Sequence, residues 1–278
     1  MSPGTAPRAL HLARALSLGR GEVAAAVGGG GKTSLLEALA AECAEAGWRP
    51  ALITTTTKIF APPPGDESLL LLGEAADLQK ALDGRPGIAE GPLTLARARL
   101  GEAPEPGARG RRRMKLEGFS PEAAGLFRRP GGVVLVEADG ARGLPLKAPG
   151  PEEPCVPPGT DLVLGVMGLD ALGAPIDAAH VFRPALLARI ADQPEGSPIT
   201  PETLGRLAAH PEGLFRGAPG GARRVVVLNK ADDAEAVEIA RKVAYIVWEL
   251  AGAPRGPAEG VVTTAFSPPG PRALGRLP

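Results

Sequence analysis

The chain has 278 residues and no formal net charge, because 31 Lys and Arg residues balance 31 Asp and Glu residues. This balance gives no reason to expect a nucleic acid or an anionic membrane as a partner. Hydrophobic residues make up 44% of the sequence but aromatic residues only 3%, so the core must be aliphatic.

The two cysteines, Cys43 and Cys155, form no C-x-x-C pair and suggest no disulfide framework. Cys43 is expected on a buried helix face, and Cys155 is expected to pack rather than react. The sequence has neither the apolar segment of a signal peptide nor a run long enough to span a membrane. We therefore expect a cytoplasmic protein.

The first expected elements alternate between helix and strand. Short apolar runs that end in glycine or polar residues predict buried parallel strands, and apolar residues three and four apart predict helices. These rules predict a helix (8–17), a strand (22–27), a helix (33–46) and a strand (50–58). Strand, glycine-rich loop, helix and strand together form a βαβ unit with a right-handed crossover.

Residues 62–130 break this alternation. Prolines at 62–64, a Pro- and Gly-rich stretch at 101–110 and a basic run at 109–115 predict an irregular insertion. It is expected to hold a short strand (68–72) and helices at 74–82 and 121–127. The basic run is expected to be a solvated loop, with an anion or partner contact near the active site as the alternative.

Regular alternation returns after residue 130. Strands are expected at 132–140, 161–170, 223–232 and 260–266, and helices at 183–191, 201–209 and 234–251.

The stretch from Ala26 to Thr33 follows the phosphate-loop pattern G-x-x-x-x-G-K-[ST], except that alanine replaces the first glycine. Alanine is harmless there if its backbone is extended or right-handed. Such a loop points backbone N–H groups at phosphate oxygens at a helix N-terminus. The residues expected to bind nucleotide phosphates are Gly28, Gly29, Gly30, Gly31, Lys32, Thr33 and Ser34. The alternative is a glycine-rich turn that leads into a helix.

Glu137 and Asp139 follow the apolar run at 133–136 and are two residues apart, so both would face the same way in an extended chain. Carboxylates at a neighbouring strand end hold Mg²⁺ in phosphate-loop enzymes, together with the loop hydroxyl, here that of Thr33. We expect these three residues to be the metal ligands, and we expect Arg142 to stabilise transition-state charge. The alternative is that the acids cap a turn.

Two further strand ends carry polar residues. Asn229, Lys230 and Asp232 form an N-K-x-D stretch, whose carboxylate could accept hydrogen bonds from guanine; a helix-capping role is the alternative for Asp232. Thr54–Lys58 follows the second strand, where Thr57 could position Mg²⁺ or water and Lys58 could meet the γ-phosphate. Plain β-strand sequence is the alternative. The expected catalytic residues are Lys32, Thr57, Lys58, Asp139 and Arg142.

Together these motifs predict an α/β P-loop NTPase fold, a three-layer sandwich with a mainly parallel central sheet. We expect one domain over residues 1–278, with a core at about 20–61 and 131–266 and the insertion at about 62–130.

The stretches "VGGGGKTSLL", "ITTTTKI", "VLVEADGARGLPLKAPGPEEP" and "RRVVVLNKAD" resemble the YqeC-type family of selenium-dependent hydroxylase accessory proteins. That family looks like a relative of the SIMIBI class of P-loop NTPases. The resemblance implies binding and hydrolysis of GTP or ATP with Mg²⁺, in the maturation of selenium-dependent molybdenum hydroxylases. A molybdenum hydroxylase or a cofactor-maturation protein would then be the client.

The residues leave other interpretations of the function open. One is a small-molecule kinase or ligase related to dethiobiotin synthetase, with residues 62–130 forming the acceptor pocket; another is a scaffold that binds nucleotide without turnover. The spacing of His11, His180 and His210 matches no metal-ligand motif, which favours surface or packing roles. The sequence leaves the oligomeric state open, with a homodimer among the alternatives.

Overall fold

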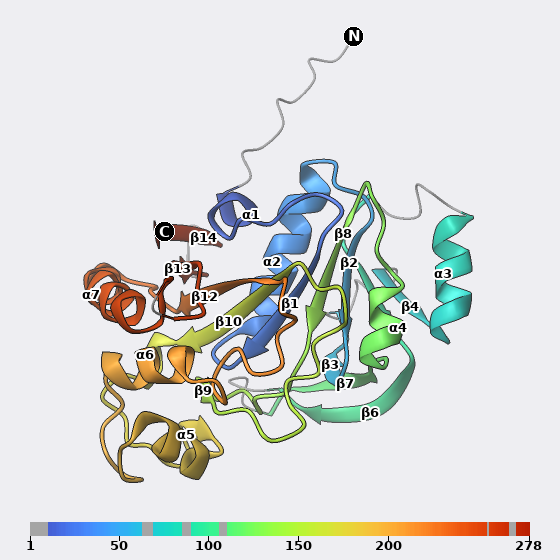
Figure 1. Ribbon diagram of the computed structural model, residues 1–278. Helices are drawn as coiled ribbons and strands as arrows, with labels where there is room; N and C mark the ends of the chain where they lie inside the picture. The colour runs from blue at the N-terminus through green and yellow to red at the C-terminus, as the bar shows by residue number, and fades with distance from the viewer. Residues whose placement is uncertain (1–10, 63–68, 85–89, 106–109, 255, 267–270) are drawn as a thin grey trace.

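The computed structural model describes residues 11–62, 69–84, 90–105, 110–254, 256–266 and 271–278. Within these residues, nine strands form a central sheet in the order β14-β13-β12-β10-β1-β8-β2-β5-β4 (Figure 1). Neighbouring strands are parallel except for β13 and β14. The strands are β1 (Val23–Gly28), β2 (Ala51–Thr55), β4 (Leu70–Leu72), β5 (Leu93–Ala96), β8 (Val133–Glu137), β10 (Leu162–Gly168), β12 (Arg223–Asn229), β13 (Gly260–Ala265) and β14 (Arg272–Leu277).

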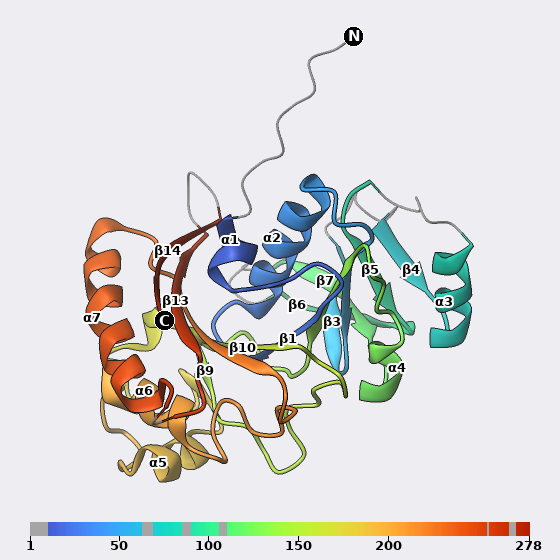
Figure 2. The ribbon, with the colours of Figure 1, turned by 45° about the horizontal axis from the view of Figure 1, so that its top comes forward.

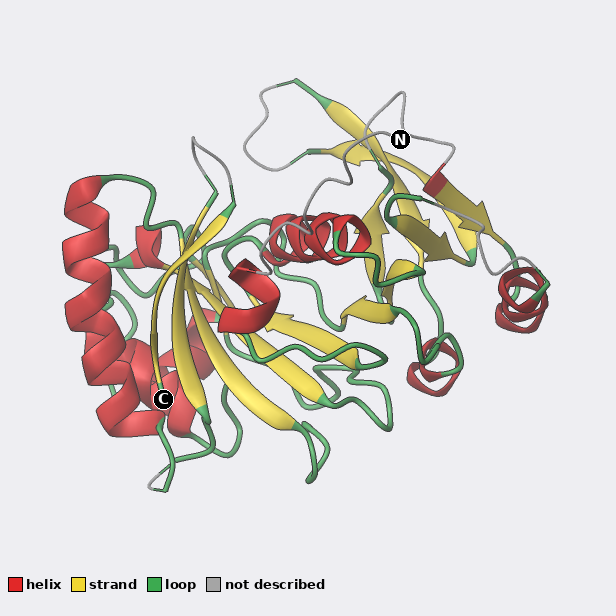
Figure 3. Cartoon of the chain, turned by 90° about the horizontal axis from the view of Figure 1, so that it is seen from above, coloured by secondary structure: helices red, strands yellow, loops and turns green. Residues whose placement is uncertain are grey.

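Helices cover both faces of the sheet, because successive side chains of each strand point to opposite sides. In β1, Ala24 and Ala26 pack toward one helix layer, whereas Val23, Ala25 and Val27 pack toward the other. The first layer holds α1 (His11–Ala15) and α2 (Lys32–Glu45). The second holds α3 (Ala75–Asp83), α4 (Pro121–Gly125), α5 (Pro184–Ala191), α6 (Pro201–Ala209) and α7 (Ala234–Ala251) (Figure 3). The predicted α/β three-layer arrangement is confirmed.

The segment at 62–130 is more regular than the sequence predicts. It supplies β4 and β5 to the central sheet, and its β6 (Ala98–Pro104) and β7 (Arg112–Glu117) form an antiparallel sheet with β3 (Lys58–Phe60). The expected solvated loop is therefore wrong for residues 112–115, which lie in β7; residue 109 lies outside the described residues. Four of the six residues of β7 are charged, so its sequence shows no apolar alternation, and only Leu116 is fully buried.

Several smaller elements differ from expectation. The strand expected at 50–58 divides into β2 and β3, because the chain leaves the central sheet after Thr55 and pairs with β7 instead. A short parallel pair, β9 (Leu146–Lys147) and β11 (Val181–Phe182), and a 3-10 turn (Leu169–Ala171) were not predicted. The remaining expected strands and helices match within a few residues, apart from their parts at 8–10 and 68, which lie outside the described residues.

No described helix is both long enough and apolar enough to cross a membrane.

Candidate functional site

The glycine loop lies at the carboxyl end of β1, the strand flanked by β8 and β10. Ala26 belongs to β1 and has extended backbone, so alanine at the first glycine position of the pattern carries no strain. Gly28 and Gly30 need positive φ, at 92° and 76°. Helix α2 begins at Lys32 without a capping side chain, which leaves the N–H groups of its first turn without an intrahelical acceptor.

Three amides of this loop already have partners in the protein. The amide of Gly28 donates to Asp139 Oδ2 at 3.0 Å, that of Gly29 to the Val166 carbonyl at 2.9 Å, and that of Gly30 to the Leu144 carbonyl at 3.0 Å. In this conformation the loop offers an anion the N-terminal turn of α2 rather than the whole ring of amides that the sequence predicts.

Lys32 and Asp139 form a buried ion pair beside the loop. Lys32 Nζ lies 3.1 Å from Asp139 Oδ1 and donates to the Gly28 carbonyl at 2.6 Å. The Lys32 ammonium is thus the ionic partner of Oδ1, which accepts no further hydrogen bond among the described residues. If Lys32 moved away, this buried oxygen would lack a donor, which costs about 1–3 kcal/mol.

Thr33 and Glu137 form a second contact beside the Lys32–Asp139 ion pair. The Thr33 hydroxyl donates to Glu137 Oε2 at 2.6 Å, and the Thr55 hydroxyl donates to the Glu137 carbonyl at 2.7 Å. Glu137 is only 7% exposed. Burial raises the pKa of its carboxyl, while the Lys32 ammonium and the Thr33 hydroxyl lower it.

These oxygens fit a Mg²⁺ ion. A hydroxyl and a carboxylate are hard ligands, and Mg²⁺ in nucleotide sites takes one or two protein oxygens and completes its shell with phosphates and water. Among the described residues, no group of three His, Cys, Asp or Glu side chains could hold a metal ion by itself. A magnesium ion at Thr33 and Glu137 would therefore need phosphate oxygens to complete its coordination.

The N-K-x-D stretch touches the glycine loop from the other side. Asn229 is buried; its Nδ2 donates to the Gly30 carbonyl at 2.8 Å, and its Oδ1 accepts from the Thr264 hydroxyl at 2.9 Å. Lys230, at φ 70°, pairs with Asp170 at 2.6 Å, and Asp232 Oδ1 accepts the Phe266 amide at 2.9 Å. Asn229 thus joins the loop to the ends of β12 and β13.

Comparison with known sequences decides the family. A profile of the YqeC protein family matches residues 24–185, more than half of the chain. The chain belongs to the YqeC family. The "Uncharacterized protein YqeC" of Escherichia coli (strain K12) is 36% identical over 222 residues, which cover 78% of each chain. No solved structure matches.

The YqeC match bears on one half of the candidate site. Its range includes Gly28–Thr33, Glu137 and Asp139, and it ends before Asn229. The stretch from Asn229 to Asp232 lies outside the range that the family profile matches.

The sequence did not predict a role for Lys147, whose side chain is completely buried in this YqeC-family protein. Its ammonium lies 3.1 Å from Asp139 Oδ2 and 2.8 Å from Glu153 Oε2, and it donates to the Gly140 carbonyl at 2.8 Å. Glu153 also pairs with Arg183 at 2.6 Å. Lys147 lies on a two-residue strand within the stretch "VLVEADGARGLPLKAPGPEEP", but no catalytic pattern singles it out, so only three-dimensional packing reveals its partners.

The remaining predicted residues lie around this centre. Thr57 contacts the Thr55 hydroxyl at 3.2 Å, Ser34 is exposed in the first turn of α2, and Lys58 is exposed on β3. Arg142, at φ 54°, stacks on the Phe182 ring with its guanidinium carbon 4.7 Å from the ring centroid. The structure therefore places Thr57 near Glu137 but holds Arg142 on Phe182, a contact that the sequence did not predict.

His180 and His210 bond residues outside this centre, whereas Cys155 adjoins it: its amide donates to the Ala138 carbonyl at 2.9 Å, and its carbonyl accepts from the Thr56 hydroxyl at 2.7 Å. His180 pairs with Asp177 at 2.8 Å, and His210 accepts the Glu212 amide at 3.1 Å. Cys43 is buried in α2, whereas Cys155 is half-buried and its thiol donates to the Glu152 carbonyl at 3.5 Å.

Proposed function

We propose that this chain binds a nucleoside triphosphate with Mg²⁺, prefers guanine, and hydrolyses the γ-phosphate bond in the cytoplasm. The observation that carries the proposal is the double pairing at the ends of β1 and β8. Lys32 meets Asp139 and Thr33 meets Glu137, beside a helix N-terminus that lacks a cap. A lysine, a hydroxyl, a carboxylate and free amides are the groups that a triphosphate with Mg²⁺ requires.

In this mechanism Lys32 leaves the Gly28 carbonyl and neutralises phosphate charge, while the first turn of α2 donates its amides. Thr33 and Glu137 would hold the metal, which would supply neutralisation of phosphate charge. Asp139 keeps its second lysine, Lys147, and so remains paired after Lys32 moves. Hydrolysis by these residues alone would be slow, and a client protein would supply the missing groups.

Binding of a fluorescent GTP analogue tests the phosphate site. Lys32→Ala is expected to lower affinity at least a hundredfold, because a buried ammonium facing phosphate is lost. Lys242→Ala, which removes an exposed lysine on α7, is the control. Equal binding by wild type and Lys32→Ala would refute the loop assignment.

Competition between GTP and ATP tests the base preference. Asp232→Asn replaces the carboxylate proposed to accept from guanine and is expected to remove the preference for GTP. The neighbouring Asp233→Asn is the matched control, because Asp233 caps α7 through the Ala236 amide. Retained GTP preference in Asp232→Asn would show that this stretch does not read the base.

The cellular role that we propose is maturation of selenium-dependent molybdenum hydroxylases, and it rests on the resemblance of the motifs to accessory proteins of that pathway. In this role phosphate release should accelerate when a client hydroxylase is added. Nucleotide binding without release of phosphate, with or without the client, would favour the scaffold reading instead.

A second candidate function is a P-loop kinase or ligase, and one observation favours it. A cavity of about 230 Å³ lies beside α2 and is lined by Glu37, Ile53, Ile59, Phe60, Pro62, Leu69, Pro92 and Thr94. Four of these residues come from the segment where an acceptor pocket was predicted. Incubation with γ-labelled nucleotide and candidate acceptors separates the two functions, since a kinase puts the label on a metabolite and a hydrolase releases it as phosphate.

A further inference from the structure

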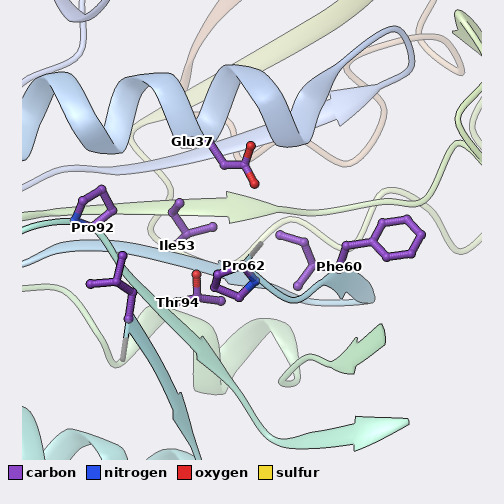
Figure 4. Close-up of a pocket in the computed structure, with 8 residues that line it drawn as sticks. Glu37, Ile53, Phe60, Pro62, Pro92 and Thr94 are labelled. Carbon is purple, nitrogen blue, oxygen red and sulfur yellow. The ribbon is translucent and has the colours of Figure 1, made fainter. Parts of the chain in front are cut away.

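The cavity beside α2 has an apolar interior and one carboxylate. Ile53, Ile59, Phe60 and the two prolines supply most of its wall, and Thr94 adds a hydroxyl. Glu37 projects from α2 toward Ile53 and Pro62 (Figure 4). A concave, mainly apolar wall with a few convergent polar groups is the usual form of a small-molecule site, and this volume lies below the roughly 300–1,000 Å³ of drug-sized pockets.

The Glu37 carboxylate has no hydrogen bond or ion pair that the described part of the chain supplies. Glu37 is exposed to solvent, although nearby protein atoms partly desolvate its carboxyl and so raise the pKa; Arg113 lowers that pKa, and the carboxylates of Glu137 and Glu105 raise it further. Arg113 itself is engaged by Glu105 at 2.7 Å. Lys115 and Arg113 lie over the Phe60 ring, at 4.4 and 5.6 Å from its centroid, but neither forms an ion pair with Glu37 among the described residues. The cavity therefore presents a carboxylate that has no direct protein partner.

The cavity also adjoins the proposed metal ligands. Glu37 is one helical turn after Thr33 on α2, so the two side chains lie on the same face of the helix. Ile53 is two residues before Thr55, whose hydroxyl holds the Glu137 carbonyl. A molecule in the cavity would lie next to the phosphate end of a bound nucleotide.

We propose that this cavity binds a small organic molecule with a protonated amine and an apolar body, the amine meeting Glu37 and the body lying against Phe60 and Ile53. The ligand deepens the proposed function by naming a second substrate or effector beside the phosphate site. Binding at the cavity does not itself require a nucleotide.

Three probes with a common phenyl ring test this charge preference on the full-length, nucleotide-free protein: 2-phenylethylamine, 2-phenylethanol and phenylacetate. Ligand-observed NMR titration is expected to rank the amine first, roughly 5- to 20-fold above the alcohol, because a charged hydrogen bond at a partly solvated carboxylate is of this strength. Phenylacetate should bind least, since like charges repel.

Glu37→Gln should abolish the advantage of the amine and leave binding of the alcohol unchanged, whereas Glu235→Gln on α7 should change neither. Thr94→Val should weaken the alcohol severalfold and keep the ranking. Absence of saturable binding by any probe, or an amine preference that survives Glu37→Gln, would overturn the proposal. The same titration on Lys32→Ala should give wild-type affinities, so failure of the nucleotide site and failure of this cavity are distinguishable.

Discussion

At the residue scale, Lys147 shows how a buried charge depends on its partners. Its side chain is completely inaccessible to solvent and lies between Asp139 and Glu153. Two carboxylates and a carbonyl replace the water that a lysine loses on burial, and these contacts offset the desolvation cost of the buried charge.

Lys147→Met is expected to lower the free energy of unfolding by about 3 kcal/mol, because Glu153 and Asp139 then lose a buried cation while the methylene volume is kept. Urea denaturation of the nucleotide-free protein measures this. Arg189→Met is the control, since Arg189 pairs with Glu212 on the surface, where such pairs contribute less than about 1 kcal/mol. Equal losses in the two variants would mean that the buried network does not stabilise the fold.

The two thiols should differ sharply in reactivity. Cys43 is fully buried, and desolvation raises its pKa to about 12, whereas Cys155 is half-buried with a pKa raised by burial and by Glu153. Because the thiolate is the reactive form, neither should react fast, and Cys43 should not react at all while the protein is folded.

In native buffer, we expect an aromatic disulfide reagent to modify the wild-type protein and Cys43→Ala slowly. Cys155→Ala should remain unmodified until denaturant is added. Rapid modification of native Cys155→Ala would show that α2 opens readily around Cys43.

At the element scale, the glycine loop is fixed by the strands beside it. A Cβ on Gly30 would lie 2.3 Å from the Gly168 amide nitrogen, and Gly30 has φ of 76°. Gly47, after α2, has a similar φ of 79° but open space around the position of a Cβ. A comparison of substitutions at Gly30 and Gly47 therefore separates the cost of a left-handed backbone from the cost of a steric clash.

Gly47→Ala is expected to cost about 1–2 kcal/mol, the penalty of a left-handed L-residue. Gly30→Ala should cost at least about 2 kcal/mol more, because rigid backbone of β10 must move away. Thermal unfolding of both variants without nucleotide provides the comparison. Similar losses would contradict the tight contact between the loop and β10.

The same elements show what the sequence could predict. Strand β1, the loop, α2 and the carboxylates at the end of β8 were predicted because apolar runs and adjacent motif residues are local signals. Strand β7 was not, since four of its six residues are charged. Neither was the role of Lys147, because a turn in the folded chain, not a sequence pattern, brings it close to Asp139. Asn229 was predicted as a base-site residue, but its bond to Gly30 depends on the packing of two segments, since the two residues are 199 positions apart in sequence.

At the scale of the whole molecule, α1 and β14 close one edge of the sheet together (Figure 2). Arg276 of β14 donates to the Ala15 carbonyl at 2.6 Å and also bonds Ser17, next to α1. Strand β14 is the antiparallel neighbour of β13, whose Thr264 holds Asn229. The edge strand is thus connected to the loop through two intermediate residues.

Deleting residues 272–278 should therefore destabilise the fold while leaving the proposed phosphate-binding residues in place. Loss of the β13–β14 hydrogen bonds and the Arg276 contacts is expected to cost on the order of 3 kcal/mol, or roughly 6–12 °C in melting temperature. Arg276→Ala alone should lower the melting temperature by only a few degrees. Because Thr264 lies opposite β14, the deletion should also weaken GTP binding more than Arg276→Ala does. A deleted protein with wild-type melting temperature would mean that β14 does not stabilise the sheet edge, and unchanged GTP affinity would mean that the edge and the base site are independent.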